Sequence, residues 1–145
     1  MKAKEYLSKV IKLKRMAESL SRKEEDLRTK AEGLKAIVYD RDKVQVSAAD
    51  RMPDVIADML MVQEQMGETI TECYRYIQTC ENRISVLKSS KQIEILRWRY
   101  IEDNNGRQYY FSEIAEKMDM QDTSAAIKLH KRALKSFAKR WGMSL

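Results

Sequence analysis

The stretch AKEYLSKVIKLKRMAESLSRKEEDLRTKAEGL, residues 3–34, decides the fold prediction because it carries a long coiled-coil repeat. Apolar residues recur at alternating spacings of three and four, and Glu24 is the one interruption. The seam consists of Ala3, Tyr6, Val10, Leu13, Ala17, Leu20, Glu24, Leu27, Ala31 and Leu34. Such spacing gives a helix a continuous apolar face over about five heptads. It predicts a first helix over about residues 2–37.

A second seam with the same spacing follows, and Gln63 is its polar interruption. Its residues are Met52, Ile56, Met59, Gln63, Met66, Ile70, Cys73, Ile77, Cys80, Ile84 and Leu87. It predicts a second helix over about residues 53–89, with Pro53 in the first turn, where its missing N–H is not needed. The polar residues 38–52 between the two seams predict a loop.

Two long helices joined by one loop are expected to form an antiparallel hairpin over residues 1–89. Folding the chain about the loop centre brings Glu24 level with Gln63, so we expect these two side chains to be neighbours. A polar residue in an apolar seam often sets the register of a helix pair.

The residues beside each seam bear on self-association. Six of the nine positions beside the first seam are basic (Lys9, Lys14, Lys23, Arg28, Lys30 and Lys35), and in a parallel zipper these would repel each other. The second helix instead carries apolar residues beside its seam: Val55, Leu60, Val62, Tyr74 and Tyr76. This wider face is expected to be covered by the C-terminal segment, a second copy or a partner protein. We favour a homo-oligomer.

The C-terminal segment, residues 90–145, has a different pattern. We expect a helix over about residues 90–101, which could continue from the second helix, and a tight turn at Asn105-Gly106. A short helix is expected over residues 111–118. Five aromatic residues are expected in the core of this small domain, namely Trp98, Tyr100, Tyr109, Tyr110 and Phe111.

The stretch TSAAIKLHKRALKSFAKRW, residues 123–141, predicts a last helix with a basic outer face. Asp122 is suited to cap it. Its inward stripe is Ala126, Leu129, Ala133, Phe137 and Trp141, and His130 is expected to bond or pack within the domain. Its cations are Lys128, Lys131, Arg132, Lys135, Lys139 and Arg140, with no acidic residue. A short helix, a turn and a basic helix that starts with small residues are typical of a helix-turn-helix domain. The predicted fold class is therefore all-α, with a helical hairpin followed by a helix-turn-helix domain.

Composition narrows the class of function. The net charge of +6 and the pI near 9.3 favour a polyanionic partner. The chain has no phosphate-cradling loop, metal-ligand cluster or carboxylate pair tied to a base, so we expect no enzyme activity, cofactor, metal or small-molecule substrate. The spacing of Cys73 and Cys80 on one helix predicts two small core residues and no disulfide. The N-terminus lacks a signal-peptide core, and no stretch is long enough to span a membrane, so a cytoplasmic protein is expected.

Three motifs in the C-terminal segment resemble region four of bacterial sigma factors. They resemble still more the sigma-like, ArpU/RinA-type regulators of phages and prophages of Gram-positive bacteria. The matching residues are Leu96, Arg99 and Tyr100, then Glu113 to Glu116, then Leu129, His130, Arg132, Ala133 and Leu134. The N-terminal stretch and part of the loop, including Asp42 to Gln45, are also similar to this group. The chain differs from it in a longer loop before Phe111 and in a turn without glycine, where Met120 follows Asp119.

The resemblance implies a transcription regulator of phage late genes that binds double-stranded DNA and contacts the RNA polymerase of the host. Carried over by position, Thr123, Ser124, Ala125 and Lys128 would face bases. Lys131, Arg132, Lys135 and Lys139 would contact the DNA backbone. The alternative is a protein-interaction module whose degenerate helix-turn-helix binds RNA polymerase or another host protein without reading DNA.

Overall fold

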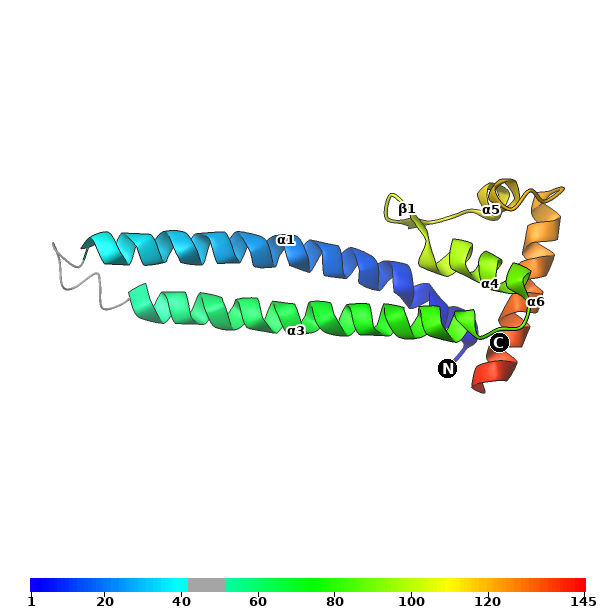
Figure 1. Ribbon diagram of the computed structural model, residues 1–145, viewed down its shortest axis with the longest axis horizontal. Helices are drawn as coiled ribbons and strands as arrows, with labels where there is room; N and C mark the ends of the chain where they lie inside the picture. Colours follow the sequence, from blue (N-terminus) through cyan, green and yellow to red (C-terminus); the bar gives the residue numbers. More distant parts are fainter. Residues whose placement is uncertain (42–51) are drawn as a thin grey trace. The chain divides into compact units, whose positions relative to one another are not determined.

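The computed structural model describes residues 1–41 and 52–145, and these are mostly helical (Figure 1). Two long helices, α1 (Ala3–Arg41) and α3 (Met52–Ser85), come first in the chain. They are followed by α4 (Ser90–Leu96), a π-helical turn η1 (Arg97–Ile101), α5 (Phe111–Lys117) and α6 (Thr123–Trp141). The only sheet in the described ranges pairs β1 (Asp103–Asn104) with β2 (Arg107–Gln108). The predicted all-α class is confirmed at this level.

The long helices end at different residues from those predicted. α1 continues to Arg41 instead of ending near residue 37, because residues 35–41 contain neither glycine nor proline to stop it. α3 ends at Ser85, four residues early, and does not continue into α4. The Ser89 side chain accepts a hydrogen bond from the Gln92 N–H (3.3 Å) and so caps α4 as a separate helix. The predicted loop, including the residues that resemble the phage group, lies mostly in 42–51, outside the described residues.

The chain forms two compact units, and the boundary between them differs from the predicted one after residue 89. The first, here called the core unit, consists of Met1–Arg15 and Cys73–Leu145. The second, here called the hairpin unit, is Met16–Glu72. The difference arises because the first turns of α1 and the last turns of α3 belong to the hydrophobic core of the C-terminal segment.

In the hairpin unit, α1 and α3 run antiparallel with the predicted register. The Gln63 Nε2 donates a hydrogen bond to Glu24 Oε1 at 3.2 Å, so the two polar interruptions are neighbours as expected. The Glu24 carboxylate also pairs with Arg28 one turn further along α1, at 2.7 Å. One polar contact between the seams therefore fixes the level of one helix against the other.

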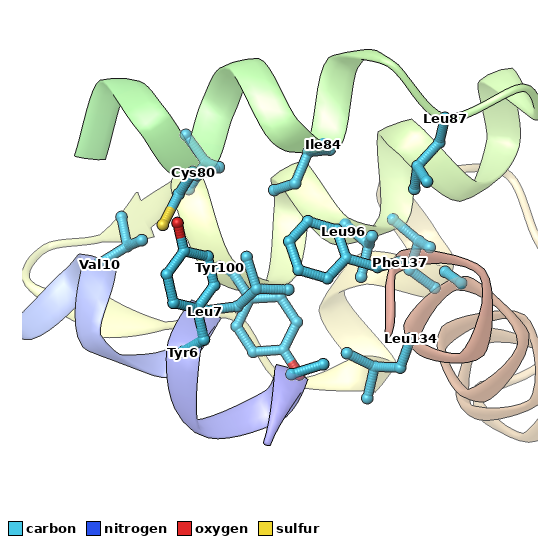
Figure 2. Packing of buried hydrophobic residues seen from close by; sticks show 14 of the residues in the cluster. Tyr6, Leu7, Val10, Cys80, Ile84, Leu87, Leu96, Tyr100, Leu134 and Phe137 are labelled. Atoms are coloured by element: carbon cyan, nitrogen blue, oxygen red, sulfur yellow. The ribbon is translucent and has the colours of Figure 1, made fainter. Parts of the chain in front are cut away.

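The core unit has one continuous hydrophobic core (Figure 2). Tyr6, Leu7 and Val10 of α1 meet Cys80 and Ile84 of α3, Leu96 of α4, Tyr100 of η1, and Leu134 and Phe137 of α6. The Tyr76 hydroxyl donates a hydrogen bond to the Tyr6 carbonyl oxygen at 2.7 Å, which joins α3 to α1. Cys73 and Cys80 are buried with free thiols, as predicted.

Aromatic residues fix the segment between α4 and α6. The buried Tyr100 belongs to the main core, and the half-buried Trp98, Tyr109 and Phe111 pack against it. Arg99 donates a hydrogen bond to the Tyr109 carbonyl oxygen and lies over the Phe111 ring, 4.2 Å from its centre. The prediction fails for Tyr110, which is 60% exposed because its ring packs under the exposed Arg107 side chain and not against the core.

A small hairpin lies in the loop before Phe111. Asn105 and Gly106 both have positive φ values (54° and 87°), which confirms the tight turn predicted for this pair. Arg107 pairs with Glu113 of α5 through two contacts of 2.8 and 3.1 Å, and Glu113 also accepts from the Tyr110 N–H. The hydrogen bonds from Arg107 are the main cause that lowers the pKa of Glu113 to about 2. The longer loop is thus tied to the start of α5.

Candidate nucleic-acid interface

The turn between α5 and α6 is ordered by its backbone. The Met120 N–H bonds to the Ala115 carbonyl (2.8 Å) and the Asp119 N–H to the Glu116 carbonyl (3.3 Å). This pair of hydrogen bonds ends α5 and requires a residue in the left-handed conformation. That residue is Asp119, which has a φ of 51°. Aspartate tolerates this conformation better than most residues do, so the turn forms without the glycine.

Asp122 starts α6 as predicted. Its backbone is extended, and its side chain accepts a hydrogen bond from the Ala125 N–H at 2.8 Å. At the other end, Gly142 adopts a left-handed conformation with a φ of 65° and ends the helix. The N-terminal turn of α6, where the predicted base contacts lie, is therefore held by a defined cap.

The inner face of α6 packs into the core unit. Ala126, Leu129, Ala133 and Phe137 are buried as predicted, and Trp141 is half-buried. His130 is buried, and its Nε2 shares a hydrogen bond of 2.7 Å with the Tyr100 hydroxyl. Its ring also packs on Phe111, with the ring centres 4.9 Å apart. The expectation that His130 acts within the domain is confirmed.

Six of the eight residues predicted to contact DNA lie on the outer face of α6. Successive residues of a helix are about 100° apart around its axis, and at this spacing the six residues fall within an arc of roughly 100°. They are Ser124, Lys128, Lys131, Arg132, Lys135 and Lys139, and all six are exposed. We call these six residues the α6 outer face. From Lys128 to Lys139 the face extends about 16 Å along the helix axis.

Two of the four residues predicted to face bases lie beside this face and not on it. Thr123 is exposed but lies about 100° around the helix from Ser124. Ala125 is half-buried and lines a hollow of about 250 Å³ together with Met118, Gln121 and Leu129. Ser124 and Lys128 are thus the two that share a surface with the predicted backbone contacts.

The electrostatics of the α6 outer face favour an anionic ligand. No acidic residue occurs in Thr123–Trp141, and none of its cations forms an ion pair within the described ranges. The unbonded N–H groups of the first turn add partial positive charge near Ser124. The nearest acidic residues in sequence are Glu116, Asp119 and Asp122, which precede the helix.

A groove that the sequence did not predict lies beside the C-terminal half of α6. It has a volume of about 580 Å³ and is formed by the α3–α4 link and α6. Its lining residues are Val86, Leu87, Lys88, Ser89, Gln92, Ser136, Lys139 and Arg140. Two segments about fifty residues apart build it, and neither carries a motif, so no local signal could have revealed it.

The described residues were compared with the requirements of a metal site and of a membrane-spanning helix, and they meet neither. In residues 1–41 and 52–145, no group of three or more His, Cys, Asp or Glu side chains could hold a metal ion. Over the same ranges, no helix has the length and apolar character that crossing a lipid bilayer requires. Comparison of the chain with protein-family models, curated proteins and solved structures gave no match.

Proposed function

We propose that the protein is a sequence-specific, double-stranded DNA-binding transcription regulator of phage or prophage late genes in the bacterial cytoplasm. The observation that supports this most strongly is the α6 outer face, whose five cations form no ion pair in the described part of the chain and lie beside a capped N-terminus. In this proposal α5, the turn and α6 act as a helix-turn-helix. The resemblance of the C-terminal motifs to sigma region four supports the same assignment.

The proposed mode of binding follows from the order of residues along α6. The major groove of B-DNA is about 12 Å wide and admits one helix. Ser124 and Lys128, near the N-terminus, would reach base edges. Lys131, Arg132, Lys135 and Lys139 would contact phosphates, which supply affinity and position but do not distinguish sequences. Thr123 and Ala125 would reach the flank of the groove.

The charge-reversal variant Lys128→Glu with Arg132→Glu tests the proposal. We expect it to lose binding to the preferred duplex while its far-ultraviolet circular dichroism stays unchanged, because both side chains are exposed. If the four proposed phosphate contacts are made by each wild-type chain, log K should fall with log salt concentration at a slope of roughly −3.6. Fluorescence anisotropy at several salt concentrations measures both quantities.

A matched control has the same change of charge on another element. Lys9→Glu with Lys12→Glu alters two exposed lysines of α1 in the core unit. Only a few-fold loss is expected from this control, since it changes the net charge without removing a proposed contact. Equal loss in both variants would mean that binding follows net charge alone, and retained binding in the α6 variant would refute the assignment.

A second candidate is a module that binds RNA polymerase or another host protein. The groove beside α6 favours it, because its lining combines the apolar Val86 and Leu87 with the cations of Lys88, Lys139 and Arg140. Such a groove suits an acidic peptide with apolar side chains. Under this alternative, Lys88→Glu should abolish capture of RNA polymerase, whereas Lys128→Glu with Arg132→Glu should not affect it.

A further inference from the structure

The hairpin unit has almost no core of its own. Among its described side chains, only Ala17, Ala31 and Ile56 are buried apolar residues. The larger seam residues are only half-buried, including Leu20, Leu27, Met59, Met66 and Ile70. Most of the stability of a helix in a protein comes from packing its apolar face. Two helices packed only on each other leave much of this face in water.

One exposed flank of α3 is apolar along the hairpin unit. Val55 and Val62 are seven residues apart, on the same side of the seam, and are 46% and 42% exposed. Met16 of α1 is 48% exposed. Heptad geometry and the antiparallel register place Met16 beside the same edge of the seam. An apolar flank in this position is typical of a helix that contacts two neighbours and not one.

The two helices of the hairpin unit carry opposite charges, and by heptad position Asp58 and Glu72 of α3 lie next to the Val55 and Val62 flank. Residues 52–72 of α3 contain five acidic and no basic residues, namely Asp54, Asp58, Glu64, Glu68 and Glu72. On α1 the flank of the same side carries Lys23 and Lys30. None of these seven groups forms an ion pair within the described part of the chain. Asp58 of α3 therefore matches Lys30 on the basic flank of another α1.

We infer that a second copy of this chain covers this flank, so that two hairpin units form an antiparallel four-helix bundle. Each α3 then packs between its own α1 and the α1 of the partner. The interface is two-fold symmetric. The contact between α3 of one chain and α1 of the other therefore occurs twice in it. This inference concerns self-association and does not depend on DNA binding.

The register of the hairpin indicates which charges meet across the interface. The Glu24–Gln63 contact sets the two helices level at that point. Six residues further along α1, Lys30 lies level with Asp58 on the antiparallel α3. A two-fold axis parallel to the helices preserves these levels between chains. The lysine stems cover Val55 and Val62, and the Lys30 ammonium group reaches the Asp58 carboxylate.

The first test measures the mass of the whole chain in solution by sedimentation equilibrium. The wild type should have twice the 17.1 kDa mass of one chain at micromolar concentration. Val55→Asp with Val62→Asp should reduce the mass to that of one chain and keep the helical circular dichroism. Met61→Asp is the matched control, because Met61 is 59% exposed on the side of α3 opposite the seam and should leave the dimer intact.

The second test uses charge exchange to identify the pair of surfaces. A chain with Lys30→Glu, and a chain with Asp58→Lys, should each be monomeric alone. Mixing them should restore a dimer that contains one chain of each kind, because only then do opposite charges meet in both contacts. A monomeric wild type, or two variants that each still dimerise alone, would overturn the inference. Dimerisation of the Val55→Asp, Val62→Asp chain would overturn it as well.

Discussion

His130 lies within a basic helix, but its side chain packs inside the domain and stabilises the fold. Its imidazole is buried between α6, η1 and the start of α5, and bonds to the Tyr100 hydroxyl at 2.7 Å. Burial is the main cause that lowers the pKa of His130 to about 4, and the nearby positive charges of Arg99 and Lys4 add to it. The neutral form is therefore the one that the folded protein holds.

This lowered pKa predicts a loss of stability in mild acid. The unfolded chain takes up a proton on His130 near pH 6.5, but the folded chain does so only near pH 4. The contribution of neutral His130 to the free energy of unfolding is therefore complete above pH 6.5 and is lost as the pH falls toward 4. It amounts to no more than about 3 kcal/mol. Urea unfolding at pH 7.5, 6.0 and 5.0 measures it.

The assignment to one side chain is direct because His130 is the only histidine in the sequence. The pKa of Glu113 is lowered to about 2, so protonation of this carboxylate reduces the stability of the fold only below about pH 4.5. A His130→Gln variant should thus show nearly constant stability between pH 7.5 and 5.0. An imidazole pKa near 6.5 in an NMR titration of the folded wild type would contradict the account.

At the scale of elements, α6 depends on its ends as much as on its apolar stripe. The Asp122 carboxylate bonds to the Ala125 N–H, and Asp119 supplies the left-handed residue that directs the chain from α5 into α6. These two residues set where the first turn of α6 begins. They therefore also set where Ser124 and Lys128 lie.

Removal of the cap gives a prediction at this scale. Asp122→Ala should lower the free energy of unfolding by about 1 kcal/mol, because an N–H of the first turn loses its acceptor. Asp122→Ser, which can still accept that hydrogen bond, should restore most of it. Chemical denaturation of both variants measures the difference, and equal stability of the alanine and wild-type chains would show that the cap does not matter.

The sequence predicted elements and faces better than it predicted their ends and their surroundings. The heptad seams predicted both long helices because spacing is a local property, and folding the chain about the loop centre predicted the antiparallel register with Glu24 beside Gln63. The inward stripe of α6 and the turn at Asn105-Gly106 were predictable for the same reason. The end of α3 at Ser85 depends on the separate capping of α4, and the exposure of Tyr110 depends on the packing of its neighbours.

The candidate site was predictable only in part. Exposed cations on α6 follow from helical spacing, but the position of Ala125 in a hollow depends on the turn packed against it. The groove at Val86 and Lys139 depends on tertiary contacts between distant segments, which no single stretch of sequence encodes.

For the whole molecule, the distribution of charge matters more than the net value of +6. The basic surface proposed to bind DNA belongs to α6 in the core unit, and the acidic residues of α3 belong to the hairpin unit. The two proposals thus use different surfaces. A dimer would present two copies of α6, and a DNA site recognised by such a dimer is expected to contain two related half-sites.

The most direct measurement of the central claim is an unbiased selection of duplexes from a random library by the purified full chain. We predict that one sequence motif is enriched, and that Lys128→Glu with Arg132→Glu abolishes the enrichment. Lys9→Glu with Lys12→Glu should enrich the same motif as the wild type. A library that stays random after repeated rounds, or a motif that the α6 variant still selects, would contradict the account.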